Sequence, residues 1–127
     1  MINLASDNVV GASREILDAI AAANAAPEAS YGADRFSREA EARLGQIFER
    51  DVKVFLVATG TAANSLALSA FTPPWGAVFC HEESHIADDE CGAPEMFTAG
   101  AKLVGIRGEA GKFSTQDLEH ALKRFPR

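Results

Sequence analysis

The sequence predicts an α/β fold with a mostly parallel sheet and flanking helices. From residue 52 onward, short apolar segments alternate with helical patterns in the order strand, helix, strand, helix, strand, helix. Parallel strands joined by helical crossovers produce this alternation. The first apolar segment, residues 52–58, is apolar at nearly every position. Such a run is typical of a strand that is buried on both faces of a parallel sheet.

Two helices are predicted before the first strand. Residues 12–25 are rich in alanine, and Ser13, near the start of this segment, is a candidate N-cap. Residues 36–50 return to a helical period, with Ser37 near the expected cap. The side chains expected on the buried face of this second helix are those of Ala40, Leu44, Ile47 and Phe48.

The alternating part of the chain continues after the first predicted strand. The remaining elements are expected as helix 62–71, strand 77–80, a helix around 89–98, strand 102–106, a turn at 108–114 and helix 115–124. Pro73 and Pro74 end the first of these helices, because proline cannot continue a helix. The last helix is expected to turn Leu118, Ala121 and Leu122 inward, with Ser114 or Thr115 as its cap.

Composition limits the classes of function. Twelve basic and eighteen acidic side chains give the 127 residues a net charge of -6, and the basic ones are scattered along the chain. This balance argues against nucleic-acid and anionic-membrane partners, which need clustered Lys and Arg. Two cysteines are too few for a disulfide framework. No leader-like or membrane-spanning apolar stretch is evident, so a cytoplasmic location is expected.

A candidate anion site follows the first predicted strand. Residues 57–64 carry the chain from a strand through Gly60 and Thr61 into a helix. The first amides of a helix have no internal partner, and the positive end of the helix dipole attracts anions, so a phosphate suits this position. The alternative is an ordinary strand-to-helix turn. No Walker lysine pattern is present, which favours a small phosphate ester over a nucleotide.

A second cluster of polar residues follows the strand at 77–80. Two cysteines and two histidines fall within twelve residues, 80–91, together with several acidic side chains. Their spacing fits no common zinc signature, so a metal site is not predicted. The alternative is that Cys80 ends a buried strand, Cys91 packs on a helix and the acids are solvated. His85 is the candidate for chemistry here, because an imidazole can stack on an aromatic cofactor or move protons near neutral pH.

Several short motifs occur together in an order that resembles one family. They are Ser6-Asp7-Asn8, Ser30-Tyr31-Gly32 with Asp34, residues 59–64, Ser84-His85-Ile86, residues 90–93, residues 100–103 and Gly111-Lys112-Phe113. In this order the sequence resembles the low-specificity L-threonine aldolase family. That family is related to the β-eliminating lyases, within the fold-type I enzymes that depend on pyridoxal 5'-phosphate (PLP). The resemblance covers nearly all 127 residues.

The resemblance implies a domain organisation and roles for individual residues. It implies that residues 1–127 are the N-terminal part of the PLP-binding large domain of an aspartate-aminotransferase-like fold, with an arm and helices at 1–51 and strand–helix units at 52–127. Gly60 and Thr61 would bind the PLP phosphate, and His85 would lie against the pyridine ring and act on the substrate hydroxyl. The residues placed near the substrate are Ser6, Tyr31 and Asp89.

The resemblance also implies partners and a reaction. The substrate would be a small β-hydroxy-α-amino acid, cleaved to glycine and an aldehyde. Tyr31 would reach a neighbouring subunit in a homodimer or homotetramer. Relatives often carry an aromatic side chain where this sequence has Asp89, which leaves substrate preference open.

One departure from the family is severe. The family's Asp-Gly-Ala-Arg motif does not occur in these 127 residues. None of the four lysines, Lys53, Lys102, Lys112 and Lys123, matches the position of the family's Schiff-base lysine. We therefore expect an N-terminal fragment that is inactive and binds PLP weakly by itself. Two alternatives stay open: another fold-type I lyase that catalyses β-elimination, or a non-catalytic domain that binds a phosphate ligand or a partner chain.

Overall fold

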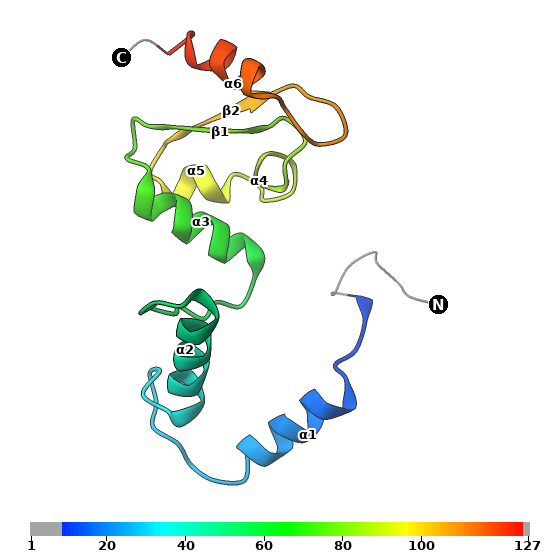
Figure 1. Ribbon diagram of the computed structural model, residues 1–127, viewed down its shortest axis with the longest axis vertical. Coiled ribbons are helices and arrows are strands. Elements are labelled where there is room, and N and C mark those ends of the chain that lie inside the picture. The colour runs from blue at the N-terminus through cyan, green and yellow to red at the C-terminus, as the bar shows by residue number, and fades with distance from the viewer. Residues whose placement is uncertain (1–8, 126–127) are drawn as a thin grey trace. The chain divides into compact units, whose positions relative to one another are not determined.

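A computed structural model describes residues 9–125 of the chain (Figure 1). The chain divides into two compact units, Met1–Phe55 and Leu56–Arg127. Among the described residues only the second unit contains a sheet, and its two strands are parallel. This confirms the predicted α/β class with parallel strands and flanking helices. No helix within residues 9–125 has the length and apolar character needed to cross a bilayer.

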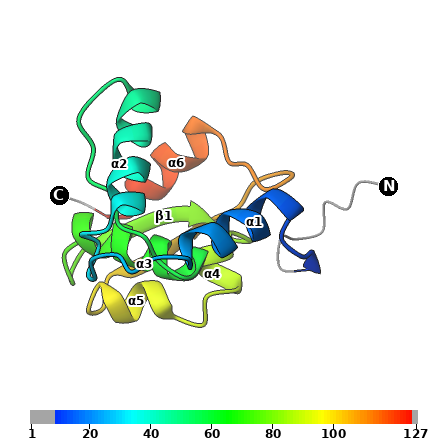
Figure 2. The same cartoon turned by 90° about the horizontal axis from the view of Figure 1, so that it is seen from below.

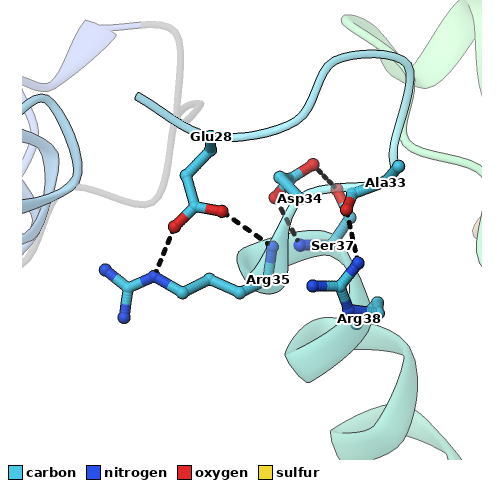
Figure 3. Close-up of polar contacts among 6 residues, drawn as sticks. All are labelled: Glu28, Ala33, Asp34, Arg35, Ser37 and Arg38. Carbon is cyan, nitrogen blue, oxygen red and sulfur yellow. Dashed lines mark hydrogen bonds and ion pairs between the residues drawn. The ribbon is translucent and has the colours of Figure 1, made fainter. Parts of the chain in front are cut away.

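The first unit contains the two predicted helices. Helix α1 spans Arg14–Ala23, and the Ser13 hydroxyl caps it by accepting a hydrogen bond from the Ile16 amide. Helix α2 spans Arg35–Phe48 and is capped by Asp34. The Asp34 carboxylate accepts hydrogen bonds from the Ser37 amide at 2.8 Å and from the Ser37 hydroxyl at 2.7 Å (Figure 3). Ser37 is thus near the cap, as predicted, but Asp34 is the capping residue.

The expected buried face of α2 is only partly correct. Ala40 and Leu44 are half-buried, whereas the side chains of Ile47 and Phe48 are exposed by 63% and 62%. The prediction for Ile47 and Phe48 is wrong for this structure. Helical spacing identifies an apolar stripe, but burial also requires an element that packs on the stripe, and the described part of this unit provides none at the end of α2.

The predicted strand at 52–58 does not form. These residues have no regular secondary structure, and Phe55 and Leu56 are exposed by 80% and 73%. A strand exists only when its backbone pairs with a neighbour, and no other strand in residues 9–125 pairs with this segment. The prediction of a strand at 52–58 is therefore wrong for this structure, because an apolar composition does not supply a pairing partner.

The second unit follows the predicted alternation from its first helix onward. Its elements are α3 (Gly60–Phe71), β1 (Ala77–His81), α4 (His85–Asp88), α5 (Ala93–Phe97), β2 (Lys102–Ile106) and α6 (Thr115–Leu122). Strands β1 and β2 pair in parallel from Ala77 with Lys102 to His81 with Ile106. Both predicted strands are therefore confirmed. Because the strands are parallel, the loops that follow β1 and β2 leave the same edge of the sheet.

Helices cover both faces of the two-stranded sheet. Helix α6 lies on one face, and α3, α4 and α5 lie on the other (Figures 1 and 2). The buried apolar side chains of the described residues include those of Cys80, Pro94, Ala101, Val104, Ile106 and Ala121. The rings of Phe79 and Phe125 meet edge to face, with centroids 5.5 Å apart, and so join β1 to the segment after α6.

Two details of the helix predictions need correction. In α6 Ala121 is buried as expected, but Leu122 is 47% exposed because it lies at the last residue of the helix. The single helix expected around 89–98 is replaced by the short helices α4 and α5. Cys91 and Gly92 between them adopt left-handed backbone conformations, with φ of 51° and 76°, and a left-handed pair interrupts a right-handed helix.

Candidate functional site

The amino end of α3 is open in the way an anion site requires. Thr59 caps the helix: its hydroxyl accepts a hydrogen bond from the Ala62 amide at 3.1 Å, and its carbonyl accepts one from the Ala63 amide at 3.2 Å. The N–H groups of Gly60 and Thr61 have no partner among residues 9–125. These two donors, at the positive end of a twelve-residue helix, are oriented to bind an anion.

Gly60 leaves space at this helix end. A Cβ atom built on Gly60 meets no atom within 4 Å outside its own turn, and the residue is exposed. Thr61 is half-buried and adds a hydroxyl next to the two amides. The free amides and the open space beside them fit a phosphate group, so the residues present fit the phosphate end of PLP.

A hydrogen-bonded chain connects α3 to His85. The Glu90 oxygen Oε1 lies 2.7 Å from Asn64 Nδ2 and 2.9 Å from His85 Nδ1. Asn64 belongs to α3 and His85 begins α4, so Glu90 joins two elements that are separated in the sequence. Asn64 lies three residues after Thr61, and residues three apart occupy neighbouring positions on one side of a helix. The helix end at Gly60 and Thr61 and the side chain of His85, which are both predicted to contact the cofactor, therefore lie in the same part of the second unit.

The two ionisable members of this hydrogen-bonded network, Glu90 and His85, differ sharply in exposure. The Glu90 side chain is fully buried, whereas the His85 side chain is 63% exposed. Within residues 9–125, His85 Nε2 has no hydrogen-bond partner. An exposed ring that is anchored through one nitrogen presents its face and its second nitrogen to a ligand. This geometry is compatible with both roles that the resemblance implies for His85, stacking on a ring and proton transfer.

The cysteines and remaining histidine of this region have other environments. Cys80 is buried near the end of β1, as the non-metal interpretation expects, but Cys91, which it expects to pack on a helix, is exposed. His81 is buried, and its Nδ1 accepts a hydrogen bond from the Glu83 amide at 3.1 Å. Within the described residues, no group of three or more His, Cys, Asp or Glu side chains is arranged to hold a metal ion.

The three residues placed near the substrate by resemblance fall in three different parts of the chain. Asp89 is exposed and caps the carboxyl end of α4, directly before the buried Glu90. Tyr31 lies in the first unit, is fully exposed and has a φ of 60°. Ser6 lies outside the described residues.

Sequence reasoning missed the roles of Asn64 and Glu90. It treated the acids of the loop after β1 as solvated, which is wrong for Glu90 because that residue is only 3% exposed. The loop offers five acidic residues, and the Asn64–Glu90 contact spans 26 positions, so no local spacing identifies the buried one. The left-handed backbone at Cys91 and Gly92, next to Glu90, is equally hard to predict from composition.

Comparison with known proteins identifies the family. A family model described as "Beta-eliminating lyase" matches residues 3–127, which is nearly the whole chain. The chain belongs to the beta-eliminating lyase family. The match extends over both the open helix end at Gly60 and Thr61 and the histidine at position 85.

Within this family the chain is similar to threonine aldolases. It is 44% identical over 121 residues to the low specificity L-threonine aldolases of a Pseudomonas species and of Pseudomonas aeruginosa. These alignments cover 94% of this chain and 35% of each relative. The chain thus spans about a third of the length of the curated relatives it matches.

A solved structure supports the fold that the resemblance implied. The threonine aldolase of Leishmania major matches 94% of this chain with a TM-score of 0.85 and 33% sequence identity. The match covers 34% of the Leishmania chain. The predicted family resemblance and the predicted fold class are both confirmed by these comparisons.

Proposed function

We propose that this chain forms part of a PLP-dependent enzyme that cleaves β-hydroxy-α-amino acids such as L-threonine to glycine and an aldehyde. The observation that carries the proposal is the pair of hydrogen bonds that links Asn64, Glu90 and His85. It holds an exposed imidazole beside the helix whose first two amides are free. The similarity to low specificity L-threonine aldolases supplies the substrate class. Because the Schiff-base lysine of the family has no counterpart in residues 1–127, the proposed activity is that of the whole enzyme.

Each proposed role follows from chemistry at a named atom. The amides of Gly60 and Thr61 and the Thr61 hydroxyl would bind the phosphate, since all are donors at a helix N-terminus. The His85 ring would lie over the pyridine ring, and its Nε2 would accept the proton of the substrate β-hydroxyl. PLP, when bound, supplies the electron sink for the pair released as the Cα–Cβ bond breaks.

We further propose that Ser6 and Asp89 contact the substrate. Asp89 is exposed and lies four residues after His85, on the turn that ends α4. A carboxylate there would favour substrates with a polar or hydroxylated side chain over purely aromatic ones. For Ser6 the proposal rests on the resemblance alone, and the role is contact with the substrate carboxylate.

We also propose a homo-oligomer in which Tyr31 contributes to the site of a neighbouring subunit. Its ring is fully exposed at the tip of a loop that its own unit stabilises. Glu28 Oε1 accepts a hydrogen bond from Arg35 Nε at 2.7 Å, and the Arg38 side chain donates to the Ala33 carbonyl (Figure 3). These contacts fix the loop from both sides and leave the tyrosine ring free to reach a partner.

Mixing two variants tests this oligomer directly. A Tyr31→Ala protein and a His85→Ala protein are each expected to be impaired, and unfolding and reassembling them together should restore activity. In a statistically assembled dimer, half of the molecules are hybrids with one intact site, so about a quarter of wild-type activity is expected. No recovery in demonstrably hybrid dimers would count against a shared site.

The reaction itself is tested on the whole gene product. Incubation with PLP and L-threonine is expected to release glycine and acetaldehyde in equal amounts, and His85→Ala is expected to lower kcat by about 100-fold or more, the range for loss of a general base. His120→Ala is the matched control, because His120 is an exposed histidine on α6. Absence of aldehyde from every β-hydroxy-α-amino acid tried would overturn the proposal.

The family description favours one second candidate, a β-elimination reaction. Elimination from L-serine gives pyruvate and ammonia, and elimination from L-threonine gives 2-oxobutyrate and ammonia. Assays for oxo acid and for aldehyde on the same samples therefore separate the two reactions. We expect aldehyde and glycine to dominate with L-threonine.

A further inference from the structure

We propose that Glu90 is a positioning residue that fixes the tautomer of His85, keeping the proton on Nδ1 and the lone pair on Nε2. The catalytic part of this proposal rests on the function proposed above and adds a role for Glu90 in it. The statement about the tautomer stands on the geometry of this chain alone.

With Glu90 ionised, the contacts determine the direction of each hydrogen bond. Glu90 Oε1 lies 2.7 Å from Asn64 Nδ2, and an amide nitrogen can only donate. The same oxygen lies 2.9 Å from His85 Nδ1. A carboxylate oxygen has two lone pairs and accepts both bonds when Nδ1 carries the proton. In a neutral imidazole the other nitrogen, Nε2, then has the free lone pair.

Burial makes this bond stronger than a surface contact of the same length. The Glu90 side chain is fully buried, so its attraction for the ring N–H is weakly screened by water. Glu83, in the same loop, is exposed and forms no side-chain hydrogen bond or ion pair with any described residue. Of these two glutamates, only Glu90 is placed to control the ring.

The same carboxylate also sets the position of the ring relative to the phosphate contacts. Asn64 is part of α3, whose first turn carries the free amides of Gly60 and Thr61. By bonding Asn64 and His85 through one oxygen, Glu90 links the proton acceptor to the helix that binds the cofactor's phosphate. An acceptor at a fixed position relative to the bound molecule is what general-base catalysis requires.

The decisive measurement is nitrogen NMR of the imidazole rings in this chain, labelled with ¹⁵N-histidine. We expect His85 in its neutral form to show a protonated Nδ1 and an unprotonated Nε2. The His85→Gln variant identifies the signals among those of His81 and His120. A protonated Nε2 in the unmodified protein would overturn the proposal without any variant at Glu90.

The variant Glu90→Gln tests the cause of the tautomer. It keeps nearly the same volume and one accepting oxygen but removes the charge. We expect the His85 signals to move toward the Nε2–H form, whereas Glu83→Gln, the same change at an exposed position, should leave them in place. Unchanged His85 signals in a folded Glu90→Gln protein would show that Glu90 does not set the tautomer.

The catalytic consequence is measured on the whole enzyme loaded with PLP. Glu90→Gln should lower kcat for L-threonine cleavage by about 10- to 100-fold with little change in KM, the range for loss of a histidine's carboxylate partner at metal sites. Glu83→Gln should behave as wild type. If the whole enzyme cleaves threonine and Glu90→Gln is fully active, this inference fails. If no variant or wild type cleaves it, the proposed function fails while the NMR result still decides the tautomer.

Discussion

Ser114 and Asp117 cap helix α6 reciprocally. The Ser114 hydroxyl accepts a hydrogen bond from the Asp117 amide at 3.2 Å, and the Asp117 carboxylate accepts one from the Ser114 amide at 2.9 Å. The hydroxyl also donates to the same carboxylate oxygen at 2.6 Å. These bonds satisfy the amides of Ser114 and Asp117, and they connect the stability of α6 to the charge on one exposed carboxylate.

The stability of α6 is therefore expected to depend on pH in the acid range. Hydrogen bonds from the Ser114 side chain, and secondarily from its backbone, hold the pKa of Asp117 below its ordinary value of 3.8. A carboxyl whose pKa is lowered by folding stabilises the helix fully above the unfolded value and stops doing so as the pH falls through the folded value. Amide exchange in α6 should accelerate in that range.

Two variants check this acid dependence. Asp117→Asn should remove it, and Glu119→Gln, which neutralises another exposed carboxylate of the same helix, should leave it in place. A carboxyl carbon titration of Asp117 with a midpoint at or above 3.8 would contradict the prediction.

Gly60→Ala should separate stability from cofactor binding. A Cβ at this position meets nothing within 4 Å, and alanine suits the first turn of a helix better than glycine, so the protein should be unchanged or stabilised by up to about 1 kcal/mol. The same methyl group would occupy the space that a phosphate needs. Titration of the whole enzyme with PLP should show at least about a tenfold loss of affinity, or 1.4 kcal/mol. Unaltered PLP affinity would argue against phosphate binding at this helix end.

Gly108→Ala should destabilise the turn between β2 and α6. A Cβ there would lie 1.8 Å from the Lys112 carbonyl oxygen, a backbone atom held by the paired hydrogen bonds between Glu109 and Lys112. Relief of this overlap must move the backbone, at a cost of about 1–3 kcal/mol or more. Urea unfolding provides the measurement.

The matched control is Gly11→Ala, where the added atom meets nothing within 4 Å. Its effect should stay within about 0.5 kcal/mol, as for ordinary surface substitutions. Equal effects of the two alanine substitutions would show that the turn adapts and that the predicted overlap carries no cost.

Ile106 offers a graded test of the core of the second unit. It is 5% exposed at the end of β2. Ile106→Val should cost about 0.5–1.5 kcal/mol and Ile106→Ala about 2–5 kcal/mol, because each step leaves a larger cavity. Denaturant midpoints of the three proteins should fall in that order. A loss below 1 kcal/mol for the alanine variant would mean that the site collapses around the smaller side chain.

The sequence predicted those parts of the fold that have local signals. Strands β1 and β2 are short apolar segments bounded by Gly76 and by the turn that begins near Gly108, and the caps at Ser13 and Ser114 follow from residue type and position. Segment 52–58 has the same apolar character but no strand to pair with in the described chain, and pairing is a long-range property.

The residues of the candidate site also divide into those with a local signal in the sequence and those without one. Gly60, Thr61 and His85 could be predicted because a helix start after an apolar segment and a histidine beyond a strand can be recognised along the chain. Glu90 could not, because its partner Asn64 lies 26 residues away and because Glu90 is a single buried acid among exposed ones in its loop. The importance of this carboxylate becomes visible only when α3 and α4 are brought together.

The neighbouring positions 89 and 90 face opposite environments, one exposed and the other buried. This arrangement separates the position proposed to affect substrate choice from the position that supports His85. If Asp89 contacts the substrate as proposed, libraries that randomise it should explore new aldehyde acceptors without disturbing the hydrogen bond between Glu90 and His85. Mutagenesis that extends by a single residue, to Glu90, would remove that hydrogen bond. On the proposed roles, the boundary for redesigning selectivity therefore lies between these two codons.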